Sequence, residues 1–223
     1  MTQAATGRDD AVGNFLAGWY GPPNSVRADA SSSEPPALRK WRQSVARWDR
    51  PIVVQNQLVP RDSADVEDDL VVFYVENQGI WLWAYGEGDD PPVYDRENEE
   101  SRAWQPSGAS LSDFLFQMTV VETVFGSERG AGASDLSPQD FDRIVGPLTA
   151  VEMTPWRWPG PEHRLWLADG VAAFGGVNEI PGANAAPGSR WEVWLAAVDD
   201  NRLGYLDELE VDWDWNSHTL RPR

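Results

Sequence analysis

The sequence predicts an α+β protein in which helices and strands occur in separate blocks. Two helical patterns lie within the first 50 residues, a run of strand-like segments extends from residue 52 to residue 94, and a helical pattern at 111–125 precedes a second strand-rich stretch. Blocks of this kind are typical of α+β folds. The 223 residues include 13 Trp, 7 Phe and 5 Tyr, which disfavours intrinsic disorder, and no Cys, which excludes a disulfide framework.

The two N-terminal helices are predicted from apolar side chains at helical spacing. The first ends at Gly21-Pro22-Pro23, and the second begins at Pro36 or Ala37 and ends at Pro51. Between them, residues 24–36 are rich in Ser, Ala and Pro, which predicts a loop. The apolar stripes are Val12, Phe15, Leu16 and Trp19, and then Leu38, Trp41, Val45 and Trp48.

Strands are predicted at Ile52–Val54, Leu70–Glu76, Ile80–Tyr85 and Val93–Tyr94. Residues 76–79 should form a turn, with Gly79 available for positive φ. Both faces of 80–85 are apolar, so this segment is either a central strand covered on both sides or a strand with one face kept for a partner.

The strongest helical pattern is Leu111–Phe125, with Ser110 as N-cap, Asp113 at N3 and Gly126 after its end. Residues 126–137 are rich in Gly and Ser, which predicts a flexible joint. A short helix should then begin at Ser137-Pro138. The remaining strands are expected at 148–153, 164–167, 171–174, 191–197 and, with clean alternation, 209–215.

Composition excludes several function classes. A net charge of −18 disfavours binding to nucleic acid or to anionic membranes and favours a basic partner. The charge could instead be a property of the host's proteins in general, since the chain has one Lys against 17 Arg. No apolar window reaches membrane-spanning length, and Met1–Asp10 carries no signal-peptide pattern, so a cytoplasmic protein is expected.

No enzymatic chemistry is predicted. The sequence has no phosphate-binding glycine loop and no nucleophile motif, and its two histidines, His163 and His218, do not make a zinc site. Asp89-Asp90 lacks the ligand spacing of an EF-hand loop. We therefore expect no cofactor and no metal, although carboxylates and Trp side chains leave a carbohydrate-active or metal-dependent enzyme as an alternative.

The candidate binding surface lies in residues 62–100, where thirteen acidic residues face a single basic one, Arg96, for a net charge of −12. The acidic clusters flank the aromatic strand 80–85. Carboxylates there could pair with Arg or Lys of a partner, and Trp83 and Tyr85 could supply the anchoring contact. Taken singly, each cluster is better explained as a solvated loop. The candidate partner-binding residues are Asp68, Asp69, Trp83, Tyr85, Glu87, Asp89, Asp90 and Asp95.

Residues 36–126 resemble the SUKH superfamily in its actinobacterial form. The resemblance rests on Leu38-Arg39-Lys40-Trp41, on LVVFYVENQG at 70–79 followed by Ile80-Trp81-Leu82-Trp83, and on later motifs in the same order. These later motifs are Pro91-Pro92-Val93-Tyr94, Trp104 and the helix start Ser110–Leu115. The resemblance implies a twisted, mostly antiparallel sheet with helices packed against it. It further implies a role as an immunity protein, one that binds a cognate toxin, often a nuclease, and blocks its active site without chemistry of its own.

The resulting domain prediction has three parts: an N-terminal helix and loop at 1–35, a SUKH-like core at 36–126 and a strand-rich C-terminal extension at 127–223. The extension could enlarge the sheet or form a second module. The functional hypothesis is a non-catalytic immunity protein that occludes a basic toxin, and a monomer is favoured over a homodimer. A housekeeping or regulatory interaction protein of the same fold is the main alternative.

Overall fold

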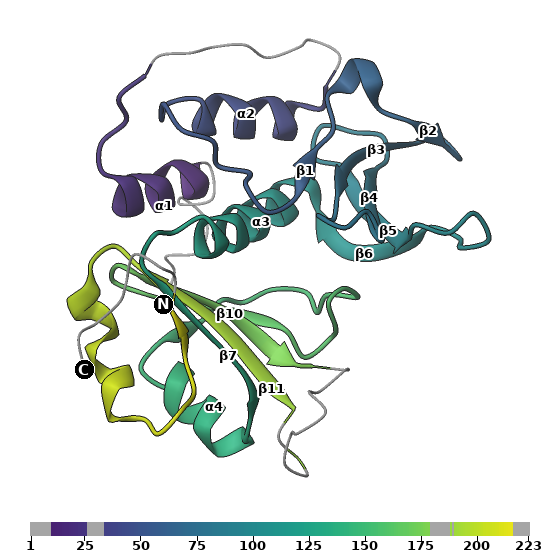
Figure 1. The fold of residues 1–223 in the computed structure, drawn as a ribbon. Coiled ribbons are helices and arrows are strands. Elements are labelled where there is room, and N and C mark those ends of the chain that lie inside the picture. The colour runs from purple at the N-terminus through teal and green to yellow at the C-terminus, as the bar shows by residue number, and fades with distance from the viewer. Residues whose placement is uncertain (1–9, 26–33, 179–187, 189, 216–223) are drawn as a thin grey trace, which may run out of the picture. The chain divides into compact units, whose positions relative to one another are not determined.

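The computed structural model describes residues 10–25, 34–178, 188 and 190–215 and divides into two compact units. Unit 1 is Met1–Thr119 and unit 2 is Val120–Arg223. The predicted α+β class is confirmed, because helices accompany two antiparallel six-stranded sheets, one in each unit (Figure 1). The division falls inside helix α3 (Leu111–Phe125), not in the glycine-rich segment that follows it.

The sheet of unit 1 has the order β1-β3-β4-β5-β6, with β2 also paired to β3. Prediction succeeds for β3, β4 and β5. The prediction of a strand at Ile52–Val54 is wrong, because Ile52 instead packs in a cluster with Leu16 and Trp48. The bounds are β1 (Gln57–Leu58), β2 (Val66–Glu67), β3 (Leu70–Val75), β4 (Trp81–Tyr85), β5 (Pro92–Glu97) and β6 (Gln105–Ser110), with the short 3₁₀ helix η2 (Arg61–Ser63) before β2.

Strand β4 is the centre of this sheet. It pairs with β3 on one side and β5 on the other, and all five of its residues are buried. Of the two alternatives for its apolar faces, the structure therefore has the covered central strand. The turn before it also matches the prediction: Gly79 has φ +74°, and the Glu76 carboxylate accepts hydrogen bonds from the backbone N–H groups of Gln78 and Ile80.

Helix α3 packs its first half against the sheet of unit 1. Phe114 lies 5.4–5.6 Å, between ring centroids, from Phe73, Tyr74 and Trp83. Phe73 and Tyr74 are sequence neighbours, and both reach α3 because the pairing of β3 with β4 is irregular between Val72 and Tyr74, as a β-bulge requires. The predicted N-cap is confirmed, since Ser110 Oγ accepts the backbone N–H of Asp113 at 3.3 Å.

Helices α1 (Ala11–Tyr20) and α2 (Pro36–Val45) complete unit 1. The indole of Trp48 donates to the carbonyl of Gly21 at 3.0 Å, which fixes the chain after α1. The indole of Trp41 donates to Thr119 Oγ1 at 2.9 Å, which ties α2 to α3. Helix α2 ends at Val45, earlier than the proline that was expected to stop it.

The sheet of unit 2 has the order β12-β7-β11-β10-β9-β8. Its core is formed with α4 and the 3₁₀ helix η3, whose buried residues include Phe141, Ile144, Leu203 and Leu206. The bounds are β7 (Gly130–Leu136), α4 (Pro138–Val145), β8 (Thr149–Ala150), β9 (Arg164–Ala168), β10 (Val171–Val177), β11 (Trp191–Ala197), η3 (Asp200–Glu208) and β12 (Asp214–Trp215).

Three predictions in unit 2 differ from the structure, and the first is the strand expected at 148–153, which is a strand only at Thr149–Ala150. The segment expected to be a flexible joint contains β7, which pairs with both β11 and β12, because its small residues allow close packing against neighbours such as Trp194. The strand expected at 209–215 is a strand only at Asp214–Trp215. The alternation of apolar and acidic residues in this segment still predicts which side chains face the core, since Leu209, Val211 and Trp213 pack against the core of unit 2.

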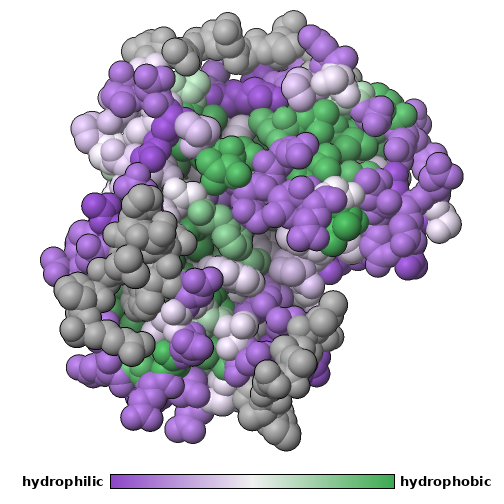
Figure 2. Space-filling view, viewed as in Figure 1, coloured by the Kyte–Doolittle hydropathy of each residue, from purple (hydrophilic) through white to green (hydrophobic). Residues whose placement is uncertain are grey.

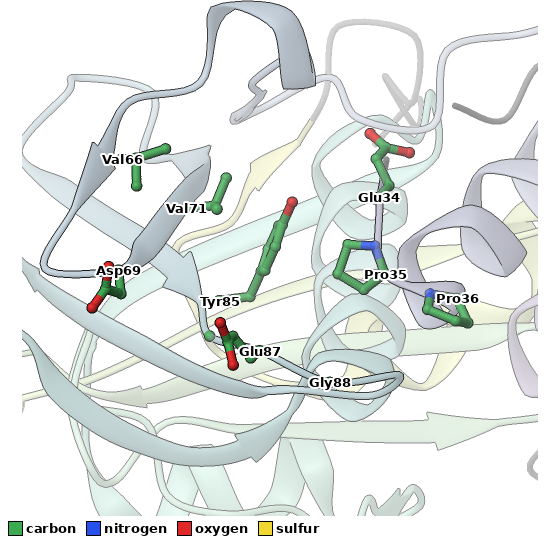
Figure 3. A pocket seen from close by; sticks show the side chains of 10 residues that line it. Glu34, Pro35, Pro36, Val66, Asp69, Val71, Tyr85, Glu87 and Gly88 are labelled. Carbon is green, nitrogen blue, oxygen red and sulfur yellow. The ribbon is translucent and has the colours of Figure 1, made fainter. Parts of the chain in front are cut away.

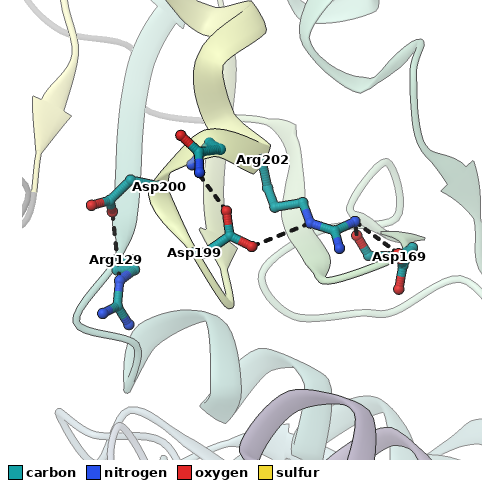
Figure 4. Close-up of polar contacts among 6 residues, drawn as sticks. Arg129, Asp169, Asp199, Asp200 and Arg202 are labelled. Atoms are coloured by element: carbon teal, nitrogen blue, oxygen red, sulfur yellow. Dashed lines mark hydrogen bonds and ion pairs between the residues drawn. The ribbon is translucent and has the colours of Figure 1, made fainter.

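Ion pairs hold η3 in unit 2 (Figure 4). Arg202 donates to the carboxylate of Asp169 at 2.8 Å, in the turn between β9 and β10, and to that of Asp199 at 3.3 Å. The hydrogen bond with Asp169 is the main cause of the raised pKa of Arg202. A second pair joins Arg129 to Asp200 at 3.6 Å. In the core, burial raises the pKa of Tyr205 to about 12, and its hydroxyl donates to the carbonyl of Ile144.

Candidate partner-binding groove

An open groove of about 460 Å³ lies in unit 1, between the β2–β3 hairpin and the start of α2 (Figure 3). This volume is within the range of roughly 300–1,000 Å³ that is common for ligand pockets. The groove is lined by Glu34, Pro35, Pro36, Val66, Asp69, Val71, Tyr85, Gly86, Glu87 and Gly88. Part of its wall is apolar and exposed, since Val66 is 61% accessible to solvent. Figure 2 shows hydrophobic side chains gathered over the β2–β4 part of unit 1, with hydrophilic ones around them.

The hairpin wall ends in a turn of two aspartates. Asp68 and Asp69 join β2 to β3 with φ of +51° and +64°, and Glu67 pairs with Leu70 directly beside them. Two consecutive positive φ values are the mark of a type I′ hairpin turn, for which Asn-Gly is the favoured pair. The hairpin was missed in the sequence because β2 has only two residues.

We expect the double substitution Asp68→Asn and Asp69→Gly to stabilise unit 1 by about 1 kcal/mol, because it relieves left-handed backbone strain in the turn. The same variant should bind a basic partner more weakly, since it lacks both carboxylates. Thermal unfolding and partner titration measure the two effects. Asp68→Asn alone is the control: it keeps Asp69 and should retain most of the affinity. A double variant with unchanged affinity would show that the turn does not face the partner.

The opposite wall is fixed by contacts with α2. The carboxylate of Glu34, which is only 5% exposed, accepts hydrogen bonds from Arg42 at 3.0 Å to each oxygen. The backbone N–H of Ala37 donates to the carbonyl of Asp89 at 3.0 Å, which ties the start of α2 to the 86–90 loop. Pro35 and Pro36 are therefore held in place as a rigid apolar surface.

Tyr85 stands between these walls. Its ring lies between Val71 and Pro35, with the carboxylates of Asp69 and Glu87 at one end of the groove and that of Glu34 at the other (Figure 3). Tyr85 is 4% exposed and packs on Phe73 at 5.4 Å. The ring therefore contributes a surface to the groove without projecting from the molecule.

Several carboxylates of residues 62–100 are engaged within the protein. Glu67 accepts from buried Arg96 at 2.8 Å and from the indole of Trp104 at 3.3 Å. Arg102 pairs with Glu97 and Glu99. By contrast, Asp68, Asp69, Glu87 and Asp89 are exposed, and their carboxylates form no ion pair or hydrogen bond with any other residue that the structure describes.

Three of the predicted site residues are corrected by the structure. Trp83 and Tyr85 are 3% and 4% exposed, because they form the packed face of β4 beneath α3, so neither can be an anchor that projects into a partner. Asp95 is 2% exposed, between Trp83 of β4 and Gln105 of β6. Of the aromatic pair, only Tyr85 reaches the groove.

Asp90 is exposed but has a structural role. Its Oδ1 accepts the backbone N–H of Ser112 at 2.8 Å, and its Oδ2 accepts the hydroxyl of the same residue at 2.6 Å. Asp90 therefore supplements Ser110 in capping α3, a contact across 22 residues that sequence spacing did not indicate.

Replacing Asp90 by Ala should lower the free energy of unfolding by about 1 kcal/mol, the usual cost of a lost helix cap. Asp90→Asn keeps the acceptor oxygen and should cost less. Neither variant should change the dissociation rate of a bound partner, because contact pairs, not distant charges, control that rate. Urea unfolding and surface-based kinetics measure the two quantities. Faster dissociation from Asp90→Asn would contradict the purely structural role.

Within the described ranges, no group of three or more His, Asp or Glu side chains is placed to hold a metal ion. His163 is 1% exposed and lies 3.2 Å from Glu192, through Nε2 and Oε1, so it is inaccessible to a substrate. The exposed large apolar side chains in the described part of the chain are Val54, Val66 and Ile80, and the indoles whose burial the structure describes are buried or partly buried.

The structure is that of an α+β protein with an open groove in unit 1. Searches against protein-family models, curated proteins and solved structures find no match for this chain. The SUKH resemblance of residues 36–126 therefore rests on the motifs quoted for it. None of the helices among the described residues has the length and apolar character needed to cross a membrane.

Proposed function

We propose that this protein is a non-catalytic binding module that captures a basic protein through the groove of unit 1. The observation that carries the proposal is the contrast among its carboxylates. Glu67, Glu97 and Glu99 are neutralised by arginines, whereas Asp69 and Glu87 line a groove with no cationic partner among the described residues. A basic side chain of another protein could form ion pairs with these two carboxylates.

The net charge of −18 supports the same proposal through electrostatic attraction that acts over longer distances than the contacts in the groove. Acidic surface raises the rate at which a basic partner is encountered, and close pairs at the groove would then slow its release. The groove also supplies apolar wall from Val66, Val71 and the two prolines. Specific interfaces combine such desolvated apolar contact with a polar rim.

The partner that we propose is a toxin domain that the protein neutralises by occlusion, as the SUKH resemblance implies. A nuclease toxin carries a basic groove for its phosphate substrate, and an acidic inhibitor could occupy it. This role requires no catalytic residue in the inhibitor. It also favours a cytoplasmic monomer, which would meet the toxin where the toxin acts.

Affinity purification from the native host tests the proposal. The tagged full chain is washed at low salt and then at about 0.5 M salt, where screening lengths fall to roughly 4 Å and loose ionic partners dissociate. We expect one basic protein to remain at near-equal stoichiometry with the tagged chain. Adding the tagged chain to this purified protein should abolish the toxic activity of the captured protein. Partners that leave entirely at the higher salt would show that the charge attracts proteins without specifying one.

A further inference from the structure

We infer that Glu67 is a positioning residue for the groove of unit 1, because its ion pair with Arg96 fixes the β2–β3 hairpin that forms one wall. Glu67 does not line the groove itself. The inference rests on the proposed function, since it concerns how the proposed docking surface is held in shape. Three observations support it: the few contacts that fix β2, the geometry around the Glu67 carboxylate and the burial of Arg96.

Few backbone contacts hold β2 in place. Among the described strands it pairs with β3 alone, over two residues. One further hydrogen bond runs from the backbone N–H of Val72 to the carbonyl of Asp65 at 3.0 Å. The turn after β2 has positive φ at Asp68 and Asp69, which costs conformational energy. Since a short two-stranded hairpin is at best marginally stable by itself, contacts beyond β3 contribute to fixing the position of β2.

The Glu67 side chain supplies such a contact. Successive residues of a strand point to opposite faces, so Val66 lines the groove and Glu67 points to the other face of the sheet. There its Oε2 accepts a guanidinium N–H of Arg96, in β5, at 2.8 Å, and the indole N–H of Trp104, just before β6, at 3.3 Å. One carboxylate oxygen therefore links the hairpin to two other parts of the sheet.

Arg96 is itself held in a fixed position. It is 7% exposed, its Nη1 donates to the carbonyls of Glu97 and Glu99 at 3.0 Å each, and its guanidinium lies 4.8 Å from the centre of the Trp104 ring. Arginine stays charged in proteins, and a buried charge without a counter-ion is costly. Within the described ranges, Glu67 is the one carboxylate that forms an ion pair with Arg96. Burial of Arg96 thus favours the conformation in which the hairpin wall is in place.

Hydrogen exchange of the full chain, followed by nuclear magnetic resonance, tests the role of the ion pair. Glu67→Gln should speed exchange of the Val72 N–H, which is bonded to the hairpin, by about tenfold, because local opening becomes easier. The Glu76 N–H, bonded across the turn before β4, should exchange at the wild-type rate. Glu97→Gln is the matched control: it removes the same charge from an exposed carboxylate that pairs with Arg102 at 2.8 Å, and it should change neither rate.

Affinity for the captured partner tests the consequence for binding. When the binding conformation is populated only part of the time, the apparent Kd rises in inverse proportion to that population. Glu67→Gln should therefore weaken binding by about fivefold, whereas Glu97→Gln should leave it near the wild-type value. Glu67→Asp keeps the negative charge but shortens the side chain by one methylene group, so it should also weaken binding. Wild-type affinity in Glu67→Asp would mean that charge, and not position, is what matters, and would overturn the inference.

Two exchange results would also overturn it. An unchanged Val72 rate in Glu67→Gln would show that the hairpin is fixed without the ion pair. Faster exchange at both Val72 and Glu76 would show that Glu67 stabilises the whole sheet and has no special role at the hairpin. Faster exchange at Val72 alone, with unchanged partner affinity, would show that the partner does not use the hairpin wall.

The failure of this inference is distinguishable from failure of the proposed function. The proposed function fails if the tagged wild-type chain retains no basic protein at the higher salt. The exchange measurements need no partner, so they still decide whether Glu67 fixes the hairpin. Conversely, a partner that is retained by wild type and by Glu67→Gln with equal affinity leaves the proposed function standing and removes the positioning role.

Discussion

Reversing the two free carboxylates that line the groove, Asp69→Lys with Glu87→Lys, is expected to weaken binding of the basic partner at least a hundredfold. Each reversal removes an attractive pair and places a like charge against the partner, and a loss of about 1.4 kcal/mol at each site already gives this factor. Titration calorimetry or surface-based kinetics with the captured partner measures the effect. The salt dependence of the association rate should also become flatter.

A matched control separates the groove from overall charge. Asp142→Lys with Glu152→Lys makes the same change in net charge at two exposed residues of unit 2 that have no described side-chain ion pair. This variant should slow association and leave dissociation unchanged. If the control and the groove variant weaken binding equally, the acidic surface acts only through net charge and the groove has no special role.

The second large effect concerns Trp83, which composition suggested as a partner anchor and the structure places in the core. Trp83→Ala should lower the free energy of unfolding by about 3–5 kcal/mol, because it leaves a cavity beside Phe114 and Tyr74. Chemical denaturation followed by circular dichroism measures this loss. Where the variant is still folded, partner affinity should be retained.

Phe114→Ala is the companion variant, because it removes the α3 side of the same contact. It should destabilise by a similar amount, and the double variant should cost less than the sum, since neighbouring side chains share one cavity. Normal stability together with lost partner binding in Trp83→Ala would reinstate the exposed-anchor interpretation and contradict the packing described here.

The acidic segment at residues 62–100 could be predicted only in part from the sequence. The excess of carboxylates in residues 62–100 is visible from composition, and it is the basis for predicting a basic partner. Which carboxylates are free is not visible, because Glu67 meets Arg96 across 29 residues and Asp90 meets Ser112 across 22. Neither contact could be predicted from helix or strand periodicity, because its two residues are far apart in the sequence.

The wall supplied by Pro35 and Pro36 also escaped prediction. Pro35 was expected in a loop before a helix, and the helix is confirmed at Pro36–Val45, while residues 26–33 of the expected loop lie outside the described residues. The role of the two prolines in the groove depends on the hydrogen bond from the backbone N–H of Ala37 to the carbonyl of Asp89. This bond joins the start of α2 to a loop more than fifty residues away in the sequence. The β2–β3 hairpin that forms the facing wall is too short to give a strand pattern.

Local spacing in the sequence determined the helices at 11–20, 36–45 and 111–125, the cap at Ser110, the turn at Gly79 and the presence of strand β4, because each depends on residues within a few positions of one another. Composition determined the acidic character, from which a basic partner is predicted. Only the tertiary structure decided that β4 is covered on both faces, that β7 is paired on both sides, that Trp83 and Asp95 are buried, and that Asp69 and Glu87 remain free. The physical reason is that burial and ion pairing depend on which distant segments meet, and a chain's local pattern does not carry that information.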